Sequence, residues 1–231
     1  MNILTNLFGS SLGKKYLMAS TGLMLLLFVT GHLIGNLQFF LGSEAINAYG
    51  HSLHTTPGIL WPARIGLLVL VALHVWSAIT LSIENKSARP VAYLNNPSPL
   101  AASYASRTML ASGLIIASFI VFHLLHYTAQ VRVVNLTGSD FRTLLDVQGR
   151  HDVFAMMVTG FSKPIVSGFY VLAVGLLSLH LSHGIGALFQ SLGVKSKAWG
   201  LLIDRAGVVC AWAIFLGYVS IPAAVLLGYG R

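Results

Sequence analysis

Residues 107–130 read RTMLASGLIIASFIVFHLLHYTAQ, an apolar stretch that carries His123 and His126. In an α-helix, which rises about 1.5 Å per residue, a stretch of this length exceeds the roughly 30 Å hydrocarbon core of a bilayer. Histidine inside a membrane helix is costly and by default marks a functional site. The stretch therefore predicts a transmembrane helix with a chemical role.

Two phrases of the sequence occur twice. A hydroxyl residue followed by glycine precedes His32, and the same pair precedes His123 at the same interval. The phrase LHVWSA, which contains His74, returns as LHLSHG, which contains His180. The glycines of the first phrase are Gly22 and Gly113. Because small residues also serve ordinary helix packing in membranes, we assign packing rather than cofactor contact to these glycines.

The composition is that of a membrane protein. Of 231 residues, 55% are hydrophobic and only 9% are charged, so nearly all of the chain is expected to lie in the bilayer. The net charge of +8 is carried between apolar runs, which favours contact with lipid or partner subunits over nucleic acid. Cys210 is the only cysteine, which excludes a disulfide framework and a covalently attached c-type haem.

The hydropathy pattern predicts an all-α protein that forms one transmembrane domain over residues 1–231. We expect helices 1–4 to form a histidine-carrying bundle, and the fifth helix, which has no histidine, to be peripheral. The five predicted helices span approximately 16–40, 60–83, 107–130, 165–190 and 206–227. Between them we expect a loop over 41–59 and a proline-containing linker over 84–106. The phrase DVFAMMV predicts a short interfacial helix, and Pro222 a kink near the end of the fifth helix.

The basic residues predict the orientation. With the N-terminus inside, eight of the fourteen lysines and arginines fall on the cytoplasmic side and the first outer loop has none, so we expect a cytoplasmic N-terminus. In this orientation His32 and His123 lie roughly 24 Å from the inner side, and His74 and His180 roughly 15 Å. The depths define two pairs, each drawn from non-consecutive helices.

Such pairs suit haem. Neutral imidazole is an axial ligand of haem iron, and two imidazoles from facing helices complete a six-coordinate site that transfers electrons. We therefore predict one haem between His32 and His123 and another between His74 and His180. His126 and His183 each follow a proposed ligand by three residues and are either alternative ligands or donors to a haem propionate. A single membrane histidine could also merely bind a serine or a carbonyl group.

Four phrases of the sequence resemble a known family. They are SLGKKYLMASTGLMLLLFVTGHLIGNL, FHLLHYT, HDVFAMMVTGFSKP and LHLSHGIGALFQSLG. Together they resemble the five-helix dihaem cytochrome b that anchors bacterial succinate dehydrogenases and fumarate reductases (succinate:quinone oxidoreductase, respiratory complex II) in the inner membrane. The resemblance covers almost the whole chain. It implies an inner haem on His74 and His180 and an outer haem on His32 and His123, and it supports His180 over His183 as a ligand.

The resemblance also implies partners and a reaction. The partners are a flavoprotein subunit, which holds the catalytic flavin and oxidises succinate in the tricarboxylic acid cycle, and an iron–sulfur subunit on the cytoplasmic face. Electrons would pass through two haem b groups to a quinone, which we expect to be menaquinone. One departure is Ser178, since some fumarate reductases of this type have a glutamate there that is linked to proton movement. Coupling by that route is not expected here.

The quinone site is predicted on the outer side. His51 and His54 lie beside Glu44 near the end of the His32 helix, and histidine can exchange protons with a quinol. An inner pocket near Arg89 or Arg107 is the alternative. Two other functions compete with the whole interpretation: a dihaem cytochrome b of a hydrogenase or formate dehydrogenase, and a transporter whose histidines bind a metal or relay protons.

Overall fold

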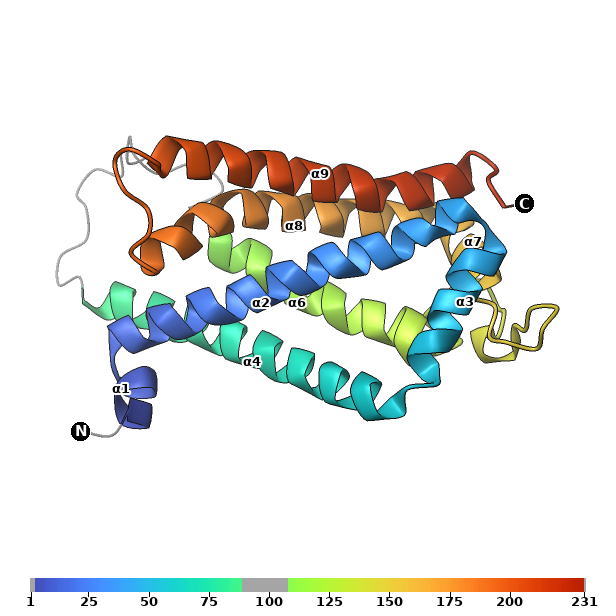
Figure 1. Ribbon diagram of the computed structural model, residues 1–231, viewed down its shortest axis with the longest axis horizontal. Helices are drawn as coiled ribbons and strands as arrows, with labels where there is room; N and C mark the ends of the chain where they lie inside the picture. The colour runs from blue at the N-terminus through green and yellow to red at the C-terminus, as the bar shows by residue number, and fades with distance from the viewer. Residues whose placement is uncertain (1–2, 89–107, 231) are drawn as a thin grey trace.

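Five long helices make up most of the computed structural model, which describes residues 3–88 and 108–230 (Figure 1). All five are long and apolar enough to cross a membrane, the third when its continuation to Thr128 is included, which confirms the predicted all-α fold with five transmembrane helices. They are α2 (Ser11–Leu37), α4 (Pro57–Ser87), α6 (Met109–His123), α8 (Pro164–Ser191) and α9 (Gly200–Leu226).

Several predicted boundaries were wrong. The first long helix begins at Ser11, because the Ser10 hydroxyl accepts a hydrogen bond from the Gly13 N–H and caps it. The second begins at Pro57, a residue that suits the first turn of a helix because it has no N–H to satisfy. It continues to Ser87, so the predicted linker begins later than expected. Residues 89–107, which hold the rest of that linker together with Arg89 and Arg107, lie outside the described residues.

Short helices occupy segments that were expected to be irregular. The predicted loop over 41–59 is mostly a helix, α3 (Ser43–His54), in which Ile46 and Asn47 are buried. A further helix, α1 (Ile3–Gly9), precedes α2. The phrase DVFAMMV is helical as predicted and forms α7 (Val153–Phe161). Single turns complete the described elements: η1 (Gln38–Leu41), η2 (Leu124–Thr128) and η3 (Phe141–Thr143).

Four of the long helices contact one another in a closed circuit. α2 packs on α4, α4 on α6, α6 on α8, and α8 again on α2. α9 packs mainly along α8 and also touches α2 (Figure 1). It runs through Pro222 without ending. The third predicted helix is α-helical up to His123, the last residue of α6, and continues as η2, a wider π-helical turn. Such turns occur mostly within α-helices and often at functional sites.

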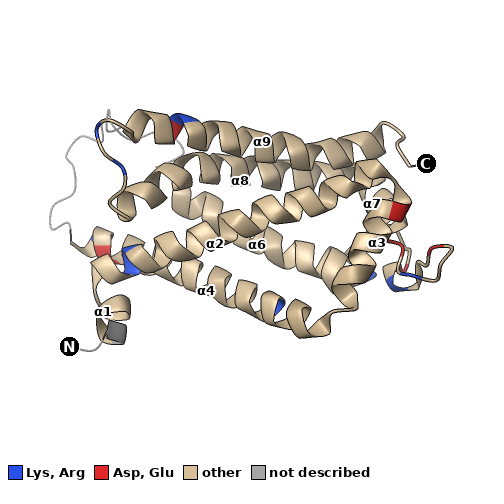
Figure 2. Ribbon diagram, in the orientation of Figure 1, with Lys and Arg blue, Asp and Glu red and all other residues tan. Residues whose placement is uncertain are grey.

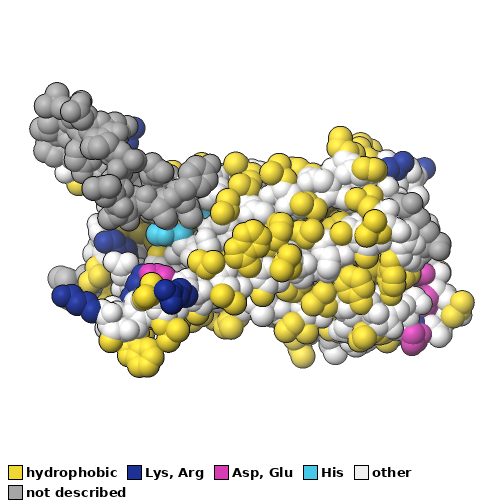
Figure 3. Space-filling view, turned by 90° about the horizontal axis from the view of Figure 1, so that it is seen from above, with side chains coloured by type: hydrophobic (Ala, Val, Ile, Leu, Met, Phe, Trp, Pro, Cys, Tyr) yellow, Lys and Arg dark blue, Asp and Glu magenta, His cyan; other side chains and the backbone are white. Residues whose placement is uncertain are grey.

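Polar and apolar side chains are separated along the length of the bundle. Charged residues lie at its two ends (Figure 2), and hydrophobic side chains cover the middle of the face seen in Figure 3. We call the end with α1 the amino-terminal end and the other the α3–α7 end. At the amino-terminal end, Lys14 forms an ion pair with Glu84, which ties the start of α2 to the end of α4.

A buried apolar cluster lies at the α3–α7 end. It joins η1, α3, α7, α8 and α9 through side chains that are nearly all inaccessible to solvent: Phe39, Ile46, Met157, Phe161, Val166, Tyr170, Ile221 and Val225. Helix α7 is therefore packed against the end of the helix bundle. The cluster fixes the ends of α2, α6 and α8 relative to one another, next to His123 and His126.

Candidate functional site

The structure brings His74 and His180 together. Their rings face each other from α4 and α8, with centroids 6.4 Å apart and planes 65° from parallel. Both side chains are half-buried. The two residues are far apart in the sequence, so the circuit of helices is what makes them neighbours.

A hydroxyl and a carbonyl of α2 hold the His74 ring. Nδ1 of His74 lies 3.1 Å from the Thr21 hydroxyl and 3.2 Å from the Met18 carbonyl oxygen. A carbonyl oxygen only accepts, so Nδ1 carries the proton. That tautomer leaves the lone pair of Nε2 free to bind a metal ion.

Gly22 supplies the space for this contact. A Cβ atom at Gly22 would lie 3.1 Å from Cε1 of His74, closer than ordinary van der Waals contact. The packing role that we assigned to this glycine is therefore incomplete, because its missing side chain admits an imidazole ring. The hydroxyl–glycine pair of the repeated phrase therefore contacts a histidine of another helix, in addition to preceding a histidine of its own helix at a fixed interval.

The second copy of the phrase does the same for His180. The Ser112 hydroxyl on α6 lies 3.4 Å from Nδ1 of His180, and a Cβ atom at Gly113 would lie 3.3 Å from its Cε1. Thus α2 seats the histidine of α4, and α6 seats the histidine of α8. Sequence reasoning found the repeat but not this exchange between helices.

His32 and His123 form a second pair, from α2 and α6. Their ring centroids are 5.9 Å apart, and the planes are 80° from parallel. The His32 ring stacks on Phe28 at 5.3 Å and lies 6.3 Å from Tyr218 of α9. Aromatic rings therefore enclose this pair, whereas backbone and hydroxyl oxygens hold the His74–His180 pair.

His126 lies beyond His123 in the π-helical turn and is fully buried. The Tyr170 hydroxyl lies 2.9 Å from its Nδ1 and 3.3 Å from Nδ1 of His123. Tyr170 has no sequence motif around it, so sequence reasoning missed it. His183 is half-buried in α8, one helical turn past His180.

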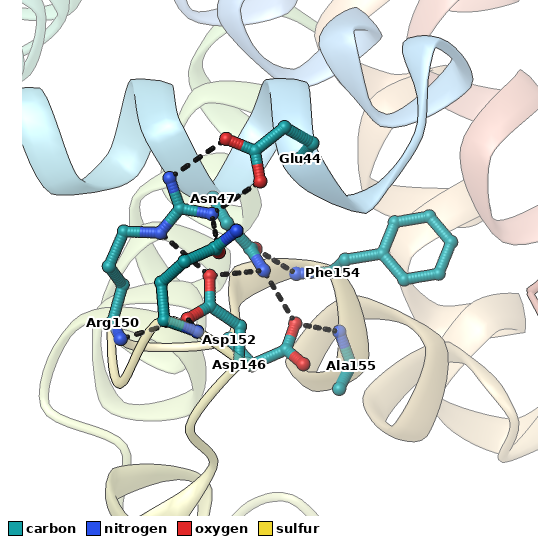
Figure 4. Close-up of polar contacts among 8 residues, drawn as sticks. Glu44, Asn47, Asp146, Arg150, Asp152, Phe154 and Ala155 are labelled. Atoms are coloured by element: carbon teal, nitrogen blue, oxygen red, sulfur yellow. Dashed lines mark hydrogen bonds and ion pairs between the residues drawn. The ribbon is translucent and has the colours of Figure 1, made fainter.

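The residues predicted to meet a quinone lie on α3. His51 and His54 are both exposed, and Nδ1 of His54 lies 2.8 Å from the Gly50 carbonyl oxygen. Glu44 is bound by both terminal nitrogens of Arg150, at 3.0 and 2.7 Å (Figure 4). The hydrogen bonds from Arg150 hold the pKa of the Glu44 carboxyl below its usual value. Glu44 therefore has a structural partner, and a role with quinone would compete with that ion pair.

Arg150 and Asn47 centre a polar network that we call the clasp (Figure 4). The guanidinium also binds Asp146 at 2.7 Å. Nδ2 of Asn47, which is buried, donates to Asp152 Oδ1 at 3.0 Å, and Oδ1 of Asn47 accepts the Phe154 N–H at 3.0 Å. A cavity of about 200 Å³ lies within the clasp. The clasp ties α3 to the start of α7.

Ser178, the departure from the resembled family noted in the sequence, is buried between α8 and α9. Its hydroxyl donates to the Ala211 carbonyl oxygen at 2.9 Å. This contact gives the residue a packing role between the two helices.

The two histidine pairs are the groups best placed to hold a metal ion. Within residues 3–88 and 108–230, no cluster of three or more histidine, cysteine, aspartate or glutamate side chains has the arrangement of a metal site. Iron held by a macrocycle needs only two protein ligands, one on each side. Comparisons of the chain with protein-family models, with curated proteins and with solved structures gave no match.

Proposed function

We propose that this chain is the membrane-anchor subunit, a dihaem cytochrome b, of a bacterial succinate:quinone oxidoreductase. It would carry electrons between an iron–sulfur subunit and a membrane quinone. The observation that carries the proposal is the pairing of four membrane histidines, His74 with His180 and His32 with His123. The four sequence phrases that resemble this family give the enzyme class.

The spacing of each pair fits an iron atom between two imidazoles. A metal–imidazole bond is about 2 Å long, and the ring centre lies about 1.1 Å beyond the nitrogen, so two imidazole rings that held one iron between them would have centres about 6.2 Å apart. The observed separations are 5.9 and 6.4 Å. The donor set also fits, since neutral imidazole is an axial ligand of haem iron.

The chain's own residues would set how these ligands behave. When bound, haem supplies a reversible one-electron change at iron. The Met18 carbonyl fixes the tautomer of His74 and Thr21 helps to orient its ring, and the Ser112 hydroxyl helps to orient the ring of His180. Such contacts raise the basicity of a ligating imidazole and stop its ring from turning.

The two pairs lie at different levels of the bundle, which suits stepwise transfer across the membrane. His74 and His180 lie nearer the amino-terminal end, while His32 and His123 lie nearer the α3–α7 end, next to the buried cluster. We propose that electrons enter at the first pair and leave for the quinone from the second. Fumarate reduction would use the reverse direction.

The amino-terminal end has the charge expected of a docking face on the cytoplasmic side. Lys14 and Lys195 are already paired, with Glu84 and Asp204. Four further basic residues at this end are exposed and are not in an ion pair with any described residue: Lys15, Lys86, Lys197 and Arg205. A surface of this kind favours an acidic partner face, here proposed to be that of the iron–sulfur subunit.

The spectrum of the purified chain tests the proposal. We expect a dithionite-reduced minus oxidised difference spectrum of b type, and two haems per chain by the pyridine haemochrome assay. Affinity purification from the native membrane should also recover flavin and iron. Absence of a haem spectrum would favour a transporter that binds metal or relays protons. A b-type spectrum with a hydrogenase or formate dehydrogenase as the recovered partner would identify the other dihaem class.

A further inference from the structure

His126 has a buried ring nitrogen without a partner. Its side chain is 0% exposed, and Nε2 has no hydrogen-bond partner among residues 3–88 and 108–230. Aromatic rings surround the imidazole, with centroids between 4.0 and 5.7 Å away: Phe122, Tyr127, Phe141 and Tyr170. Buried polar atoms in native proteins are nearly always hydrogen-bonded. The orphaned nitrogen therefore points to a group that joins the protein when it is loaded.

Tyr170 connects this nitrogen to the His32–His123 pair. The Tyr170 hydroxyl lies between two imidazoles, 3.3 Å from Nδ1 of His123 and 2.9 Å from Nδ1 of His126. A phenol has one proton to donate, and its oxygen can accept at the same time. The tautomer of His123 can therefore determine the tautomer of His126 through the Tyr170 hydroxyl.

The direction of these hydrogen bonds follows from the proposed function, on which this inference rests. If His123 binds iron through Nε2, then Nδ1 carries the proton and donates to the Tyr170 oxygen. The Tyr170 hydroxyl must then donate to Nδ1 of His126. With Nδ1 accepting, the neutral His126 ring carries its proton on Nε2. The orphaned atom is thereby a hydrogen-bond donor in an apolar cage.

We propose that His126 Nε2–H donates to an oxygen acceptor of the bound cofactor or substrate, and that Tyr170 is the positioning residue that fixes this donor. The acceptor chemistry is a carboxylate or a carbonyl oxygen. A haem propionate supplies the first and a quinone supplies the second. His126 is thus a binding residue for one of these groups and not a third axial ligand.

If the acceptor is a propionate, removing the Tyr170 hydroxyl and removing the His126 imidazole should shift the midpoint potential of the haem at His123 in opposite directions. Tyr170→Phe removes the acceptor for the His123 N–H, which makes the ligand less basic and raises the potential of that haem. His126→Phe removes a donor to a negative carboxylate, which leaves more negative charge near the iron and lowers the potential. If the acceptor is a quinone carbonyl, His126→Phe should instead raise the quinone KM by about tenfold and leave the haem signals unchanged.

The experiment uses the full complex carrying Tyr170→Phe, His126→Phe or His126→Gln. The glutamine variant retains an N–H donor. Tyr218→Phe is the matched control, because its hydroxyl donates to the Val29 carbonyl oxygen and its ring lies near His32 but outside the chain of hydrogen bonds. The measurements are haem content, the electron paramagnetic resonance signal of each ferric haem, the two midpoint potentials and the quinone KM.

Opposite shifts at one haem, absent in Tyr218→Phe and partly restored in His126→Gln, support the propionate. A raised quinone KM with unchanged haem signals, restored in His126→Gln, supports the quinone. Two haems with unchanged signals, potentials and KM in all variants would overturn the proposal and leave a buried water as the partner. Equal loss of one haem from both His126 variants, with Tyr170→Phe unaffected, would also overturn it. A wild-type chain without haem would contradict the proposed function instead.

Discussion

The Thr21 hydroxyl lies 3.1 Å from Nδ1 of His74, across 53 positions of sequence and between two different helices. Ser112 and His180 repeat the relationship at 3.4 Å across 68 positions. The chain therefore contains two copies of one device, in which a hydroxyl–glycine pair on one helix receives an imidazole from the next. The His32–His123 pair has a different environment, with Tyr170 in place of a serine or threonine hydroxyl.

The first prediction concerns the seats of these histidines. Thr21→Val removes the hydroxyl and keeps the branched shape, so His74 should lose orientation and its haem should bind about 10- to 100-fold more weakly, the usual effect of losing a contact to a metal-binding histidine. Haem retention during dilution and the spectrum of each component measure this. Thr30→Val is the control, because the Thr30 hydroxyl donates to the Leu26 carbonyl oxygen of its own helix. Equal haem loss in both variants would contradict a specific role for Thr21.

The second prediction tests the pairing. Substitution of His74 or of His180 by leucine should remove the same haem and lower the content from two haems per chain to one, because each iron needs both imidazoles. The haem that stays should be the one bound by His32 and His123. His183→Leu tests the alternative ligand on the same helix and should retain both haems if His180 is the ligand. Loss of different spectral components from the His74 and His180 variants would disprove the pairing.

The third prediction concerns the clasp and its dependence on pH. Hydrogen bonds from Arg150 lower the pKa of Glu44; for Asp146, burial raises the pKa, but hydrogen bonds from the Arg150 backbone and side chain outweigh it and leave the pKa lowered. A carboxyl with a lowered folded-state pKa stabilises the fold above its unfolded pKa of about 4, and this contribution is lost as the pH falls below it. Arg150→Ala should therefore be less stable than the wild type at pH 7, and the difference should shrink below about pH 4.

Thermal unfolding of the detergent-solubilised chain, followed by circular dichroism across this pH range, measures the effect. Arg132→Ala is the control, since the Arg132 side chain donates to the Gly138 carbonyl oxygen within the same loop. A stability difference for Arg150→Ala that stays constant from pH 7 to pH 3 would show that the carboxyls do not contribute through this ion-pair network.

The fourth prediction concerns the partner subunit. A short amine-reactive cross-linker should join the iron–sulfur subunit to exposed lysines of the amino-terminal end, such as Lys86, or to Lys195 in its ion pair with Asp204. Mass spectrometry of the complex identifies the joined peptides. Lys163, at the start of α8, lies at the α3–α7 end and should not react with that subunit. Cross-links from Lys163 alone would reverse the proposed orientation.

The fifth prediction concerns the quinone. If His51 or His54 exchanges protons with quinol, replacing it by glutamine should lower succinate:quinone turnover by about 10²- to 10⁴-fold, the usual range for a general acid or base. Haem content and succinate oxidation by a soluble dye should stay unchanged. Both side chains are exposed on α3, so the substitutions carry little risk to the fold. Full quinone turnover in both variants would place the site elsewhere in the complex.

The sequence by itself determined the class of fold and the candidate ligands. Apolar stretches of bilayer length predict helices regardless of what they pack against, because the cost of burying an unpaired backbone group in lipid leaves few alternatives. Histidines within those stretches stand out as candidate ligands because a polar side chain is also costly to bury in lipid. Depth counting along His32, His74, His123 and His180 then predicted which rings would be neighbours. Short polar segments carry no comparable signal, so the helix Ser43–His54 was missed.

Only the tertiary structure decided what surrounds each histidine. The contacts of Thr21 with His74 and of Tyr170 with both His123 and His126 join different helices, and their geometry depends on how those helices rotate and approach. A wide π-helical turn at Leu124–Thr128 determines the position of His126, and no sequence pattern predicts this turn. Hydrophobic periodicity reports which residues avoid water, but a hydrogen bond between helices requires two side chains to meet within about 3 Å, and that is settled by packing.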